Sequence, residues 1–480
     1  MTQIWLDMRM PLVGRRAERQ VLLDALQSPE AELVAVYGRR RVGKTFLIRE
    51  VYRDAICFEL VGMHGVDASR QLRAFAGALG LATPPADWQR AFEELRARLS
   101  AQLRRRRAKQ VVFFDEVPWL ASRRSGFLAA FEHFWNGWAV KQPKLVIVIC
   151  GSAASWMLEK VVRQRGGLHN RVTRRLRVDP FSLAEVEELL RSRRVDLGRY
   201  QVIELYMALG GIPHYLVQVR SGESAAEAID RLCFTRDGFL RTEFADLYAG
   251  LFEKAERHEA VVRALAARRR GMTRAQLLAA TRLGSGGSIT KVLGELEQCG
   301  FVAQMPRLGH AKRDAVYWLA DHYSLFFLKW IEPHRGSARG AWQRKRASPA
   351  WRAWSGLAFE AVCLRHVESI KRALGIAGVE TTEGAWERRA AEGRDGAQVD
   401  LVIERADRSV NLCEMKFSES ELVIDRAYAR ELERKRDAYR AAFGDRKATF
   451  LTLISTYGLR VNDHVQRLGI RALTMDALFD

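Results

Sequence analysis

Paired cysteines are absent from this sequence. The chain has 480 residues and six cysteines, which lie singly and form no Cys-x-x-Cys motif. Structural zinc sites and disulfide-rich secreted domains both need cysteines in pairs, so neither class fits. Cys363 and His366 are close in the sequence, but a zinc site would need a second pair of ligands. Single thiols are typical of a cytoplasmic protein, and we expect that location.

Long apolar runs are also absent. The longest mostly apolar stretch, residues 145–158, contains a glycine and two serines and is shorter than the ~20 residues of a membrane-spanning helix. Residues 1–16 include Asp7 and lack the apolar core of a signal peptide. We therefore expect no association with a membrane.

Acidic residues are fewer than basic ones. The 78 Lys and Arg residues exceed the 57 Asp and Glu residues, which leaves a formal net charge of +21 at pH 7. This sign favours polyanionic partners, although a basic surface can also serve solubility alone. Hydrophobic residues make up 48% of the chain, so disorder throughout is excluded. At about 150 residues per domain, the length predicts about three folding units.

A phosphate-binding loop follows a predicted buried strand. Residues 33–37 are apolar, and residues 45–51 continue as a helix. The sequence between them has the form Gly-x-x-x-x-Gly-Lys-Thr, whose glycines let backbone N–H groups surround phosphate oxygens. Lys44 should reach the β- and γ-phosphates of ATP, and Thr45 should bind Mg²⁺. The predicted ATP-binding residues of the loop are Gly38, Arg39, Arg40, Arg41, Val42, Gly43, Lys44 and Thr45.

Polar residues follow two further predicted strands. The apolar run 111–114 ends in Asp115 and Glu116, so we expect Asp115 to hold Mg²⁺ and Glu116 to orient the attacking water. A solvated acidic turn is the alternative. Ser152 follows another strand and is predicted to sense the γ-phosphate of ATP. Strands at 56–61, 145–150 and 176–178, with helices between them, predict a doubly wound parallel sheet.

These motifs resemble the archaeal-type ATPases, a branch of the AAA+ and STAND NTPases. The resemblance covers residues 10–250 and rests on segments 11–15, 37–45, 114–116, 151–152 and 180–182. It implies that Arg171 approaches a γ-phosphate, in a homo-oligomer from the neighbouring subunit. Gly210-Gly211-Ile212-Pro213 resembles the signature before the lid helices of this branch, and a helix-breaking turn is the alternative.

The middle of the chain has the pattern of a winged helix. Helices are predicted at 257–269, 273–281 and 288–299, and strands at 301–307 and 315–319. The third helix has one apolar face, while its other face carries a single basic residue, Lys291. Direct DNA reading by this helix and a role as an ATPase lid or between domains therefore both remain open. The turn at 307–313 is more basic and suits contact with a DNA backbone.

A basic linker is predicted at 335–353. Six basic residues and no acidic one lie between Arg335 and Arg352, with Trp342 and Trp351 among them. A nucleic-acid-tracking segment with stacking aromatics is one interpretation. A connector whose tryptophans cover the next domain is the other.

The C-terminal part has the order helix, two strands, helix, strand. Its predicted ranges are 354–374, 398–404, 409–417, 425–443 and 448–454. This order is similar to the restriction-endonuclease-like domain often fused to archaeal-type ATPases. The resemblance implies that Asp400 and Glu414 hold Mg²⁺, that Lys416 positions or activates water, and that Glu360 adds a carboxylate. The usual proline before the metal-binding aspartate is replaced by Val399.

The acidic-x-Lys motif by itself does not discriminate. It also occurs at Glu433-Arg434-Lys435 and Asp445-Arg446-Lys447. Position favours the first copy, because Glu414 and Lys416 share one face of a strand and Asp400 is predicted to end a neighbouring strand. A structural salt bridge among Asp400, Glu414 and Lys416 is the alternative.

The sequence thus predicts an α/β protein in five parts. They are a P-loop ATPase core (1–190), a helical lid (191–250), a winged helix (251–334), the basic linker (335–353) and a restriction-endonuclease-like domain (354–480). We expect an ATPase that uses ATP and Mg²⁺, acts on DNA and carries a metal-dependent endodeoxyribonuclease. An ATP-gated DNA-binding regulator without cleavage is one alternative. A signalling scaffold that binds protein or RNA is another.

Overall fold

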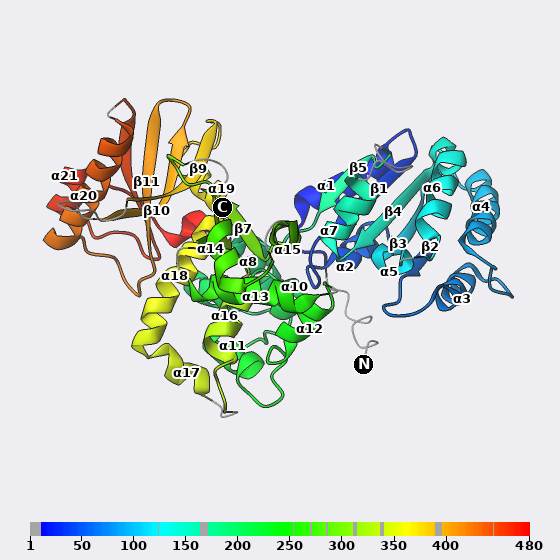
Figure 1. Ribbon diagram of the computed structural model, residues 1–480, viewed down its shortest axis with the longest axis horizontal. Coiled ribbons are helices and arrows are strands. Elements are labelled where there is room, and N and C mark those ends of the chain that lie inside the picture. Colours follow the sequence, from blue (N-terminus) through cyan, green and yellow to red (C-terminus); the bar gives the residue numbers. More distant parts are fainter. Residues whose placement is uncertain are drawn as a thin grey trace. The chain divides into compact units, whose positions relative to one another are not determined.

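The structure is a computed structural model that describes most of the chain (Figure 1). It describes residues 11–480 except 123, 164–170, 253, 269–270, 285–286, 311–313, 337–339, 389–395 and 445. The chain divides into two compact units, residues 1–180 and 181–480. Each unit is described by itself.

The first unit is built on a parallel sheet. Its described strands are β1 (Glu32–Tyr37), β2 (Ile56–Val61), β3 (Gln110–Asp115), β4 (Leu145–Gly151) and β5 (Arg174–Arg177). Their order is β2-β3-β4-β1-β5, and all neighbouring pairs are parallel. Every residue of β3 and β4 is buried, as continuous apolar runs predict for a sheet covered on both faces. The predicted parallel α/β fold is confirmed.

Helices cover this sheet. They are α1 (Arg16–Gln27), α2 (Lys44–Val51), α3 (Ala68–Leu79), α4 (Trp88–Arg105), α5 (Val117–Leu120), α6 (Phe127–Gly137), η1 (Ala139–Lys141), α7 (Ala154–Trp156) and η2 (Met157–Arg163). In α4, the buried residues Trp88, Phe92 and Leu95 recur at helical spacing and form one apolar face. Asp87 caps this helix by accepting a hydrogen bond from the Arg90 N–H at 2.8 Å. The aromatic side chains of α4 and α6 thereby pack together on the sheet.

The second unit begins with helices. They are α8 (Leu183–Ser192), α9 (Arg199–Leu209), α10 (Pro213–Leu216), α11 (Ala225–Cys233), α12 (Glu243–Ala249), α16 (His322–Phe326), η4 (Phe327–Ile331) and α17 (Ala341–Arg346).

The Gly-Gly-x-Pro segment has a packing reason for glycine. A Cβ on Gly211 would lie 1.9 Å from the Phe181 carbonyl oxygen, so no larger residue fits there.

The predicted basic linker is folded where it is described. Trp342 in α17 is 1% exposed and stacks on Phe234 with a centroid distance of 5.6 Å. Trp351 is also buried and packs edge-on against Trp342. The apolar area of these rings is worth more inside the core than in water. The interpretation of 335–353 as a segment with aromatics free to stack on bases is therefore wrong for these two tryptophans.

Three helices and a small antiparallel sheet form the middle of the second unit, in its described part. They are α13 (Ala255–Ala267), β6 (Met272–Thr273), α14 (Arg274–Thr281), α15 (Gly287–Gln298), β7 (Val302–Met305) and β8 (Val316–Leu319), with strand order β6-β8-β7. The apolar face predicted for α15 is buried: Ile289, Val292, Leu293 and Leu296. On its other face, Lys291 lies 3.8 Å from Glu295. The tip of the predicted basic turn, 311–313, lies outside the described residues.

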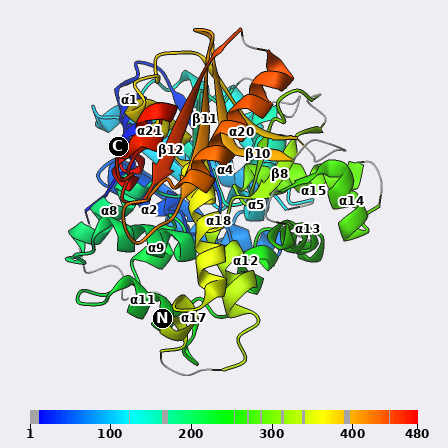
Figure 2. The ribbon, with the colours of Figure 1, turned by 90° about the vertical axis from the view of Figure 1, so that its left-hand side faces the viewer.

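A mixed sheet forms the C-terminal part of the second unit. Its elements are α18 (Pro349–Arg365), α19 (Val367–Ala373), β9 (Thr381–Arg388), β10 (Ala397–Arg405), β11 (Ser409–Lys416), α20 (Arg426–Phe443), β12 (Ala448–Ser455), α21 (Asp463–Leu468), β13 (Arg471–Leu473) and η5 (Met475–Leu478). The order is β13-β12-β11-β10-β9, with β9, β10 and β11 antiparallel and β11, β12 and β13 parallel. Figure 2 shows β10, β11 and β12 side by side with α20 against them.

This part differs from the prediction in several details. The sequence did not predict β9, α21, β13 and η5. The helix expected at 354–374 is two helices, because the chain breaks at His366, whose ring accepts a hydrogen bond from the Leu183 N–H at 3.0 Å. Asp400 lies within β10 rather than at its end, beside an irregularity in the pairing with β9. A bulge of this kind re-aims the side chains of a strand.

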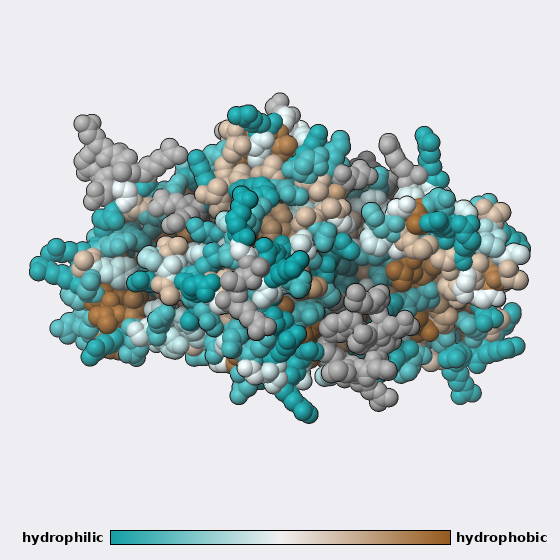
Figure 3. Space-filling model, turned by 90° about the horizontal axis from the view of Figure 1, so that it is seen from below, coloured by the Kyte–Doolittle hydropathy of each residue, from teal (hydrophilic) through white to brown (hydrophobic). Residues whose placement is uncertain are grey.

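The surface in the view of Figure 3 is mostly hydrophilic, with separate small hydrophobic areas. Among the described residues, no helix is both long and apolar enough to cross a membrane.

Candidate functional sites

The phosphate-binding loop connects β1 to α2. Gly38 has φ 152° and Gly43 has φ 89°, which is the conformational region that glycine adopts at low cost. A Cβ on Gly38 would lie 2.2 Å from the Val178 carbonyl oxygen, so the close approach of β5 also requires glycine there. Within the loop, Arg39 and Val42 are buried, and Arg40 and Arg41 are half-buried.

Lys44 lies inside the loop. Its Nζ donates hydrogen bonds to the carbonyl oxygens of Gly38 and Arg39, both at 2.9 Å, and the side chain is 6% exposed. A buried ammonium group needs acceptors or an anion beside it. The loop therefore concentrates positive charge at the N-terminus of α2, where a phosphate is stabilised.

The two predicted Mg²⁺ ligands of this unit are in contact. β3 ends at Asp115, and the Thr45 hydroxyl donates a hydrogen bond to Asp115 Oδ2 at 2.6 Å. Hydroxyl and carboxylate oxygens are the donors that Mg²⁺ takes from proteins beside substrate phosphates. The residues present therefore fit Mg²⁺, and Thr45 and Asp115 would hold it.

Glu116 and Ser152 are brought together because they follow β3 and β4, which are neighbouring parallel strands. The Ser152 N–H and hydroxyl both donate to the Glu116 carboxylate, the N–H at 3.1 Å. Glu116 has φ 49°, an unusual value for a residue with a side chain, and such strain gathers at functional sites. Ser152 thus fixes the orientation of Glu116, a contact that the sequence did not predict.

Arg171 is not joined to the loop among the described residues. It is exposed in the turn before β5, next to residues 164–170, which lie outside the described residues. Two neighbouring arginines are held elsewhere, since Arg174 lies 3.1 Å from Glu32 and Arg177 lies 2.9 Å from Asp179. Arg171 therefore remains the predicted arginine finger.

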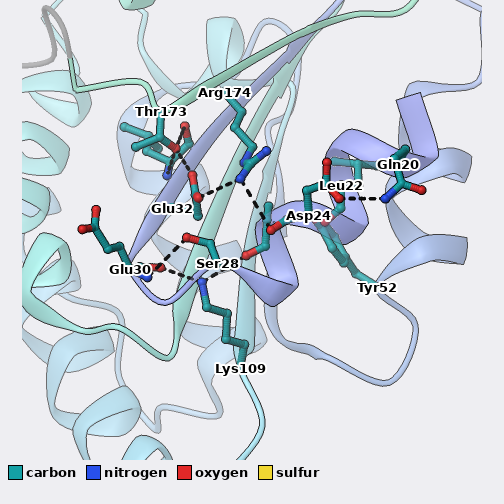
Figure 4. A network of polar contacts seen from close by, with 12 residues as sticks. Gln20, Leu22, Asp24, Ser28, Glu30, Glu32, Tyr52, Lys109, Thr173 and Arg174 are labelled. Atoms are coloured by element: carbon teal, nitrogen blue, oxygen red, sulfur yellow. Dashed lines mark hydrogen bonds and ion pairs between the residues drawn. The ribbon is translucent and has the colours of Figure 1, made fainter. Parts of the chain in front are cut away.

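A second polar network joins β1 and β5 at their first residues (Figure 4). Glu32 accepts hydrogen bonds from Thr173 and Arg174. Burial raises the pKa of Glu32, but the Thr173 and Arg174 hydrogen bonds outweigh it and lower that pKa. Lys109 donates to the carbonyl oxygens of Ala25 and Glu30. This network attaches the edge strand β5 to the sheet.

A strand, a glycine loop around a buried lysine, and a threonine bonded to an aspartate at the end of a second strand together define a P-loop NTPase fold. Residues 12–219 match the family model described as an ATPase domain predominantly from Archaea. The chain therefore contains an archaeal-type ATPase domain.

Further comparisons extend beyond this domain. An uncharacterized protein of Methanocaldococcus jannaschii is 22% identical over 414 residues, which cover 85% of this chain and 88% of that protein. The Walker-type ATPase of Pyrococcus abyssi is 18% identical over 67% of this chain and 97% of its own, with a TM-score of 0.47. The Aeropyrum pernix ORC2 protein, in ADPNP-ADP complexes, is 16% identical over 70% and 96%, with a TM-score of 0.41.

A second cluster of charged residues lies on the C-terminal sheet. Leu401 in β10 pairs with Cys413 in β11. Their chain neighbours Asp400 and Glu414 therefore lie at facing positions of the two antiparallel strands. The Met415 N–H donates to Asp400 Oδ2 at 2.9 Å. Glu414 is 2% exposed, and Lys416 Nζ lies 3.9 Å from Glu414 Oε2. Glu360 comes from α18.

The carboxylates of this cluster act on one another. Burial, and then the charges of Asp400 and Glu414, raise the pKa of Glu360 to about 8. Burial, and then the charge of Asp400, raise the pKa of Glu414 to about 7. Like charges that cannot all ionise together have a strong preference for a cation between them. The four predicted residues Glu360, Asp400, Glu414 and Lys416 therefore share one site.

Lys435 was missed as a member of this site. Its Nζ donates to Glu414 Oε2 at 2.7 Å from α20, and it also lies 3.2 Å from Glu431. Burial lowers the pKa of Lys435, but Glu414 outweighs it and raises that pKa. The sequence did carry a signal, because Glu433-Arg434-Lys435 repeats the acidic-x-Lys motif. That motif places its acidic residue and its lysine on one face of a strand. Lys435 instead lies on helix α20 and contacts Glu414 where this helix packs on the sheet.

The donor set of the cluster fits a divalent cation in part. Glu414 Oε1 is buried and has no hydrogen-bond partner among the described residues. A buried carboxylate oxygen without a partner is costly, and a hard cation would satisfy it. Within the described part of the chain, no group of three or more His, Cys, Asp and Glu side chains is already arranged as a metal site. Asp400 and Glu414 are the two residues that would hold the metal.

Proposed function

We propose that this protein hydrolyses ATP in its first unit and cuts DNA with metal ions in its second. The ATPase half rests on the family match together with the Thr45–Asp115 contact at 2.6 Å. The nuclease half rests on Glu414, a buried carboxylate facing Asp400 and contacted by two lysines. Residues 251–334 act as a winged helix beside this site, and residues 354–480 form a restriction-endonuclease-like domain. We place the protein in the cytoplasm.

In the ATPase, each of these contacts corresponds to a role of the residue in catalysis. Lys44 exchanges its loop carbonyl partners for the β- and γ-phosphate oxygens, which stabilises the charge that develops during transfer. Thr45 and Asp115 would hold Mg²⁺, which would supply neutralisation of the phosphate charge. Glu116, oriented by Ser152, accepts the hydrogen bond of the attacking water. Arg171 supplies a positive charge to the nucleotide of a neighbouring subunit in a homo-oligomer.

In the nuclease, side chains of the protein position the attacking water and the scissile phosphate. Asp400 and Glu414 would hold a divalent cation, which would supply polarisation of the scissile phosphate. Lys416 is half-exposed at the end of β11 and orients the attacking water. Lys435 holds Glu414 in place from α20. Glu360, with its pKa near 8, can accept or release a proton near neutral pH.

Removal of the Lys44 ammonium tests the ATPase. We expect Lys44→Ala to lower phosphate release by at least tenfold, because a buried charge that binds phosphate is lost. The measurement is steady-state release of phosphate from ATP by the full chain. Lys160→Ala, on η2, is the matched control and should leave the rate unchanged. Equal rates for Lys44→Ala and the unaltered protein would contradict the assignment.

Removal of the Asp400 carboxylate tests the nuclease. We expect the unaltered protein to cleave plasmid and linear DNA in the presence of Mg²⁺ or Mn²⁺. The Asp400→Ala variant should cleave at least a hundredfold more slowly, because it lacks a metal ligand. Asp407→Ala, in the turn between β10 and β11, is the control. Equal cleavage by unaltered protein and Asp400→Ala would sink the proposal.

A DNA-binding regulator without cleavage is the second candidate. The Lys435–Glu414 ion pair favours it, because a buried pair can hold the sheet and α20 together with no metal. Val399 in place of the usual proline points the same way. Binding of DNA that survives in Asp400→Ala, with no cleavage by the unaltered protein at any metal concentration, would select this function.

A further inference from the structure

A large cavity in the second unit opens onto the acidic cluster. It has a volume of about 1090 Å³, and α13, β8, η4, α18, β9 and β10 all contribute to its wall. Small-molecule sites are typically about 300–1,000 Å³, so this cavity is large enough for more than one small group. Glu360 and Asp400 both line it. Of the proposed nuclease centre, Glu360 and Asp400 thus face this cavity, whereas Glu414 and Lys416 are not among the residues that line it.

Some charged side chains of the cavity wall are held in ion pairs, and others are not. Glu332 is held by Arg263 at 2.8 Å, and Glu387 is held by Arg307 at 3.1 Å. Two cations of the lining, Arg268 after α13 and Lys329 in η4, are exposed and have no ion pair among the described residues. The cavity thus offers the positive charges of Arg268 after α13 and of Lys329 in η4, whose Nζ lies 5.7 Å from the Trp330 ring centroid, together with the carboxylates on α18 and β10.

Aromatic rings form another part of the wall. Trp318, Trp354 and Trp386 line the cavity; Trp318 is half-buried, whereas Trp354 and Trp386 are buried. Trp354 is 5% exposed, and its indole N–H has no hydrogen-bond acceptor among the described residues. A buried donor without an acceptor is costly. An occupant that combines flat rings with acceptor oxygens would satisfy both features.

We propose that this cavity takes a single strand of DNA, one of whose bases lies against the half-buried Trp318 and whose phosphates meet Arg268 and Lys329. Stacking platforms and unpaired cations are the two elements by which proteins hold single strands. A duplex keeps its bases inside the stack, so only a strand that has left the duplex can lay a base against a ring of the cavity wall. The inference rests on the proposed nuclease and narrows its substrate to unpaired DNA.

Binding tests the cavity separately from cleavage. The full chain carrying Asp400→Asn, without divalent metal, is titrated into a labelled 20-nucleotide single strand and into the same sequence as a duplex, with fluorescence anisotropy as the readout. We expect the single strand to bind at least tenfold more tightly. Adding Trp318→Ala should weaken single-strand binding by about tenfold, because stacking contributes ~1–3 kcal/mol per base.

Matched variants separate stacking from misfolding. Trp318→Phe keeps a ring and should restore most of the affinity, whereas Trp138→Ala, in the first unit, should change nothing. Joint replacement of Arg268 and Lys329 by alanine should reduce the salt slope of single-strand binding by about 1.4, since each phosphate contact contributes ~0.7. Duplex binding as tight as single-strand binding, or a Trp318→Ala protein with unchanged affinity, would overturn the inference.

Cleavage then shows which proposal fails. If the unaltered protein cuts no DNA while Trp318-dependent single-strand binding is present, the nuclease is wrong and the strand-binding cavity stands. If it cuts duplex and single strand at equal rates, and Trp318→Ala cuts equally well, the cavity inference is wrong and the nuclease stands.

Discussion

At the scale of single residues, Lys435 is the contact on which the C-terminal site depends. It joins Glu414 at 2.7 Å inside the protein, and the other lysine, Lys416, is 3.9 Å away and half-exposed. Two buried charges are costly to remove from water, and each is tolerated mainly because the other is present. The pair therefore links α20 to β11 whether or not the site is catalytic.

Truncation of Lys435 should destabilise the second unit. We expect Lys435→Met to lower the free energy of unfolding by about 1–3 kcal/mol, because Glu414 loses its nearest partner and its buried carboxyl group is left unsatisfied. Urea unfolding followed by circular dichroism measures the change. The control is Lys447→Met, which removes a more exposed pair with Glu404 and should cost only about 0–1 kcal/mol. Similar losses for the two variants would show that Lys435 has no special role.

At the scale of elements, His366 explains why one predicted helix is two. Its ring is fully buried between α18 and α19, donates to the Val362 carbonyl and accepts from the Leu183 N–H at the start of α8. Burial, and then the charge of Arg365, counteracted in part by the Val362 hydrogen bond, lower the pKa of His366 to about 4. The ring thus serves the packing of three helices as a neutral group.

This burial predicts a pH dependence of stability. The unfolded chain binds a proton at His366 near pH 6.5, whereas the folded chain does so only near pH 4. Between these values the unfolded state holds more protons, so stability falls as the pH falls, by up to ~1.4 kcal/mol per pH unit. His366→Gln should flatten the decline in thermal midpoint between pH 6.5 and 4, while His310→Gln, at an exposed position, should not. Parallel pH profiles for all three proteins would contradict the assignment.

At the scale of the whole molecule, the net charge of +21 is only partly free for DNA. Arg174, Arg177, Arg263 and Arg307 are all held in ion pairs, and Lys44 lies inside the nucleotide loop. Any contacts with DNA phosphates must come from the basic residues that are not held in ion pairs. Affinity for DNA should therefore depend on salt, but less steeply than the total charge would predict.

The salt dependence of DNA affinity checks this expectation. We expect log K to fall linearly with log[salt] for a duplex, with a slope between about −4 and −9, because each phosphate contact contributes ~0.9. Fluorescence anisotropy between 50 and 200 mM KCl, with the polyanion heparin as competitor, provides the measurement. A slope near zero would instead support the alternative of a scaffold whose surface binds protein partners.

Local patterns were sufficient for the nucleotide site. Gly38, Gly43, Lys44 and Thr45 are neighbours in the chain, and Asp115 ends a strand that a continuous apolar run marks. Parallel strands end at one edge of a sheet, so this spacing alone placed Thr45 beside Asp115. The predicted β10 and β11 were likewise found, because alternation along a strand determines which residues share a face.

Other contacts needed the tertiary structure. Lys435 meets Glu414 across 21 positions of the chain, Ser152 meets Glu116 across 36, and Trp342 and Trp351 turn inward although basic residues surround them. The sequence by itself determined the elements and the chemistry of the ATPase loop, because backbone conformation and side-chain periodicity are local properties. Only the tertiary structure decided which charges pair and which rings are buried, because pairing and burial depend on packing between elements distant in the chain.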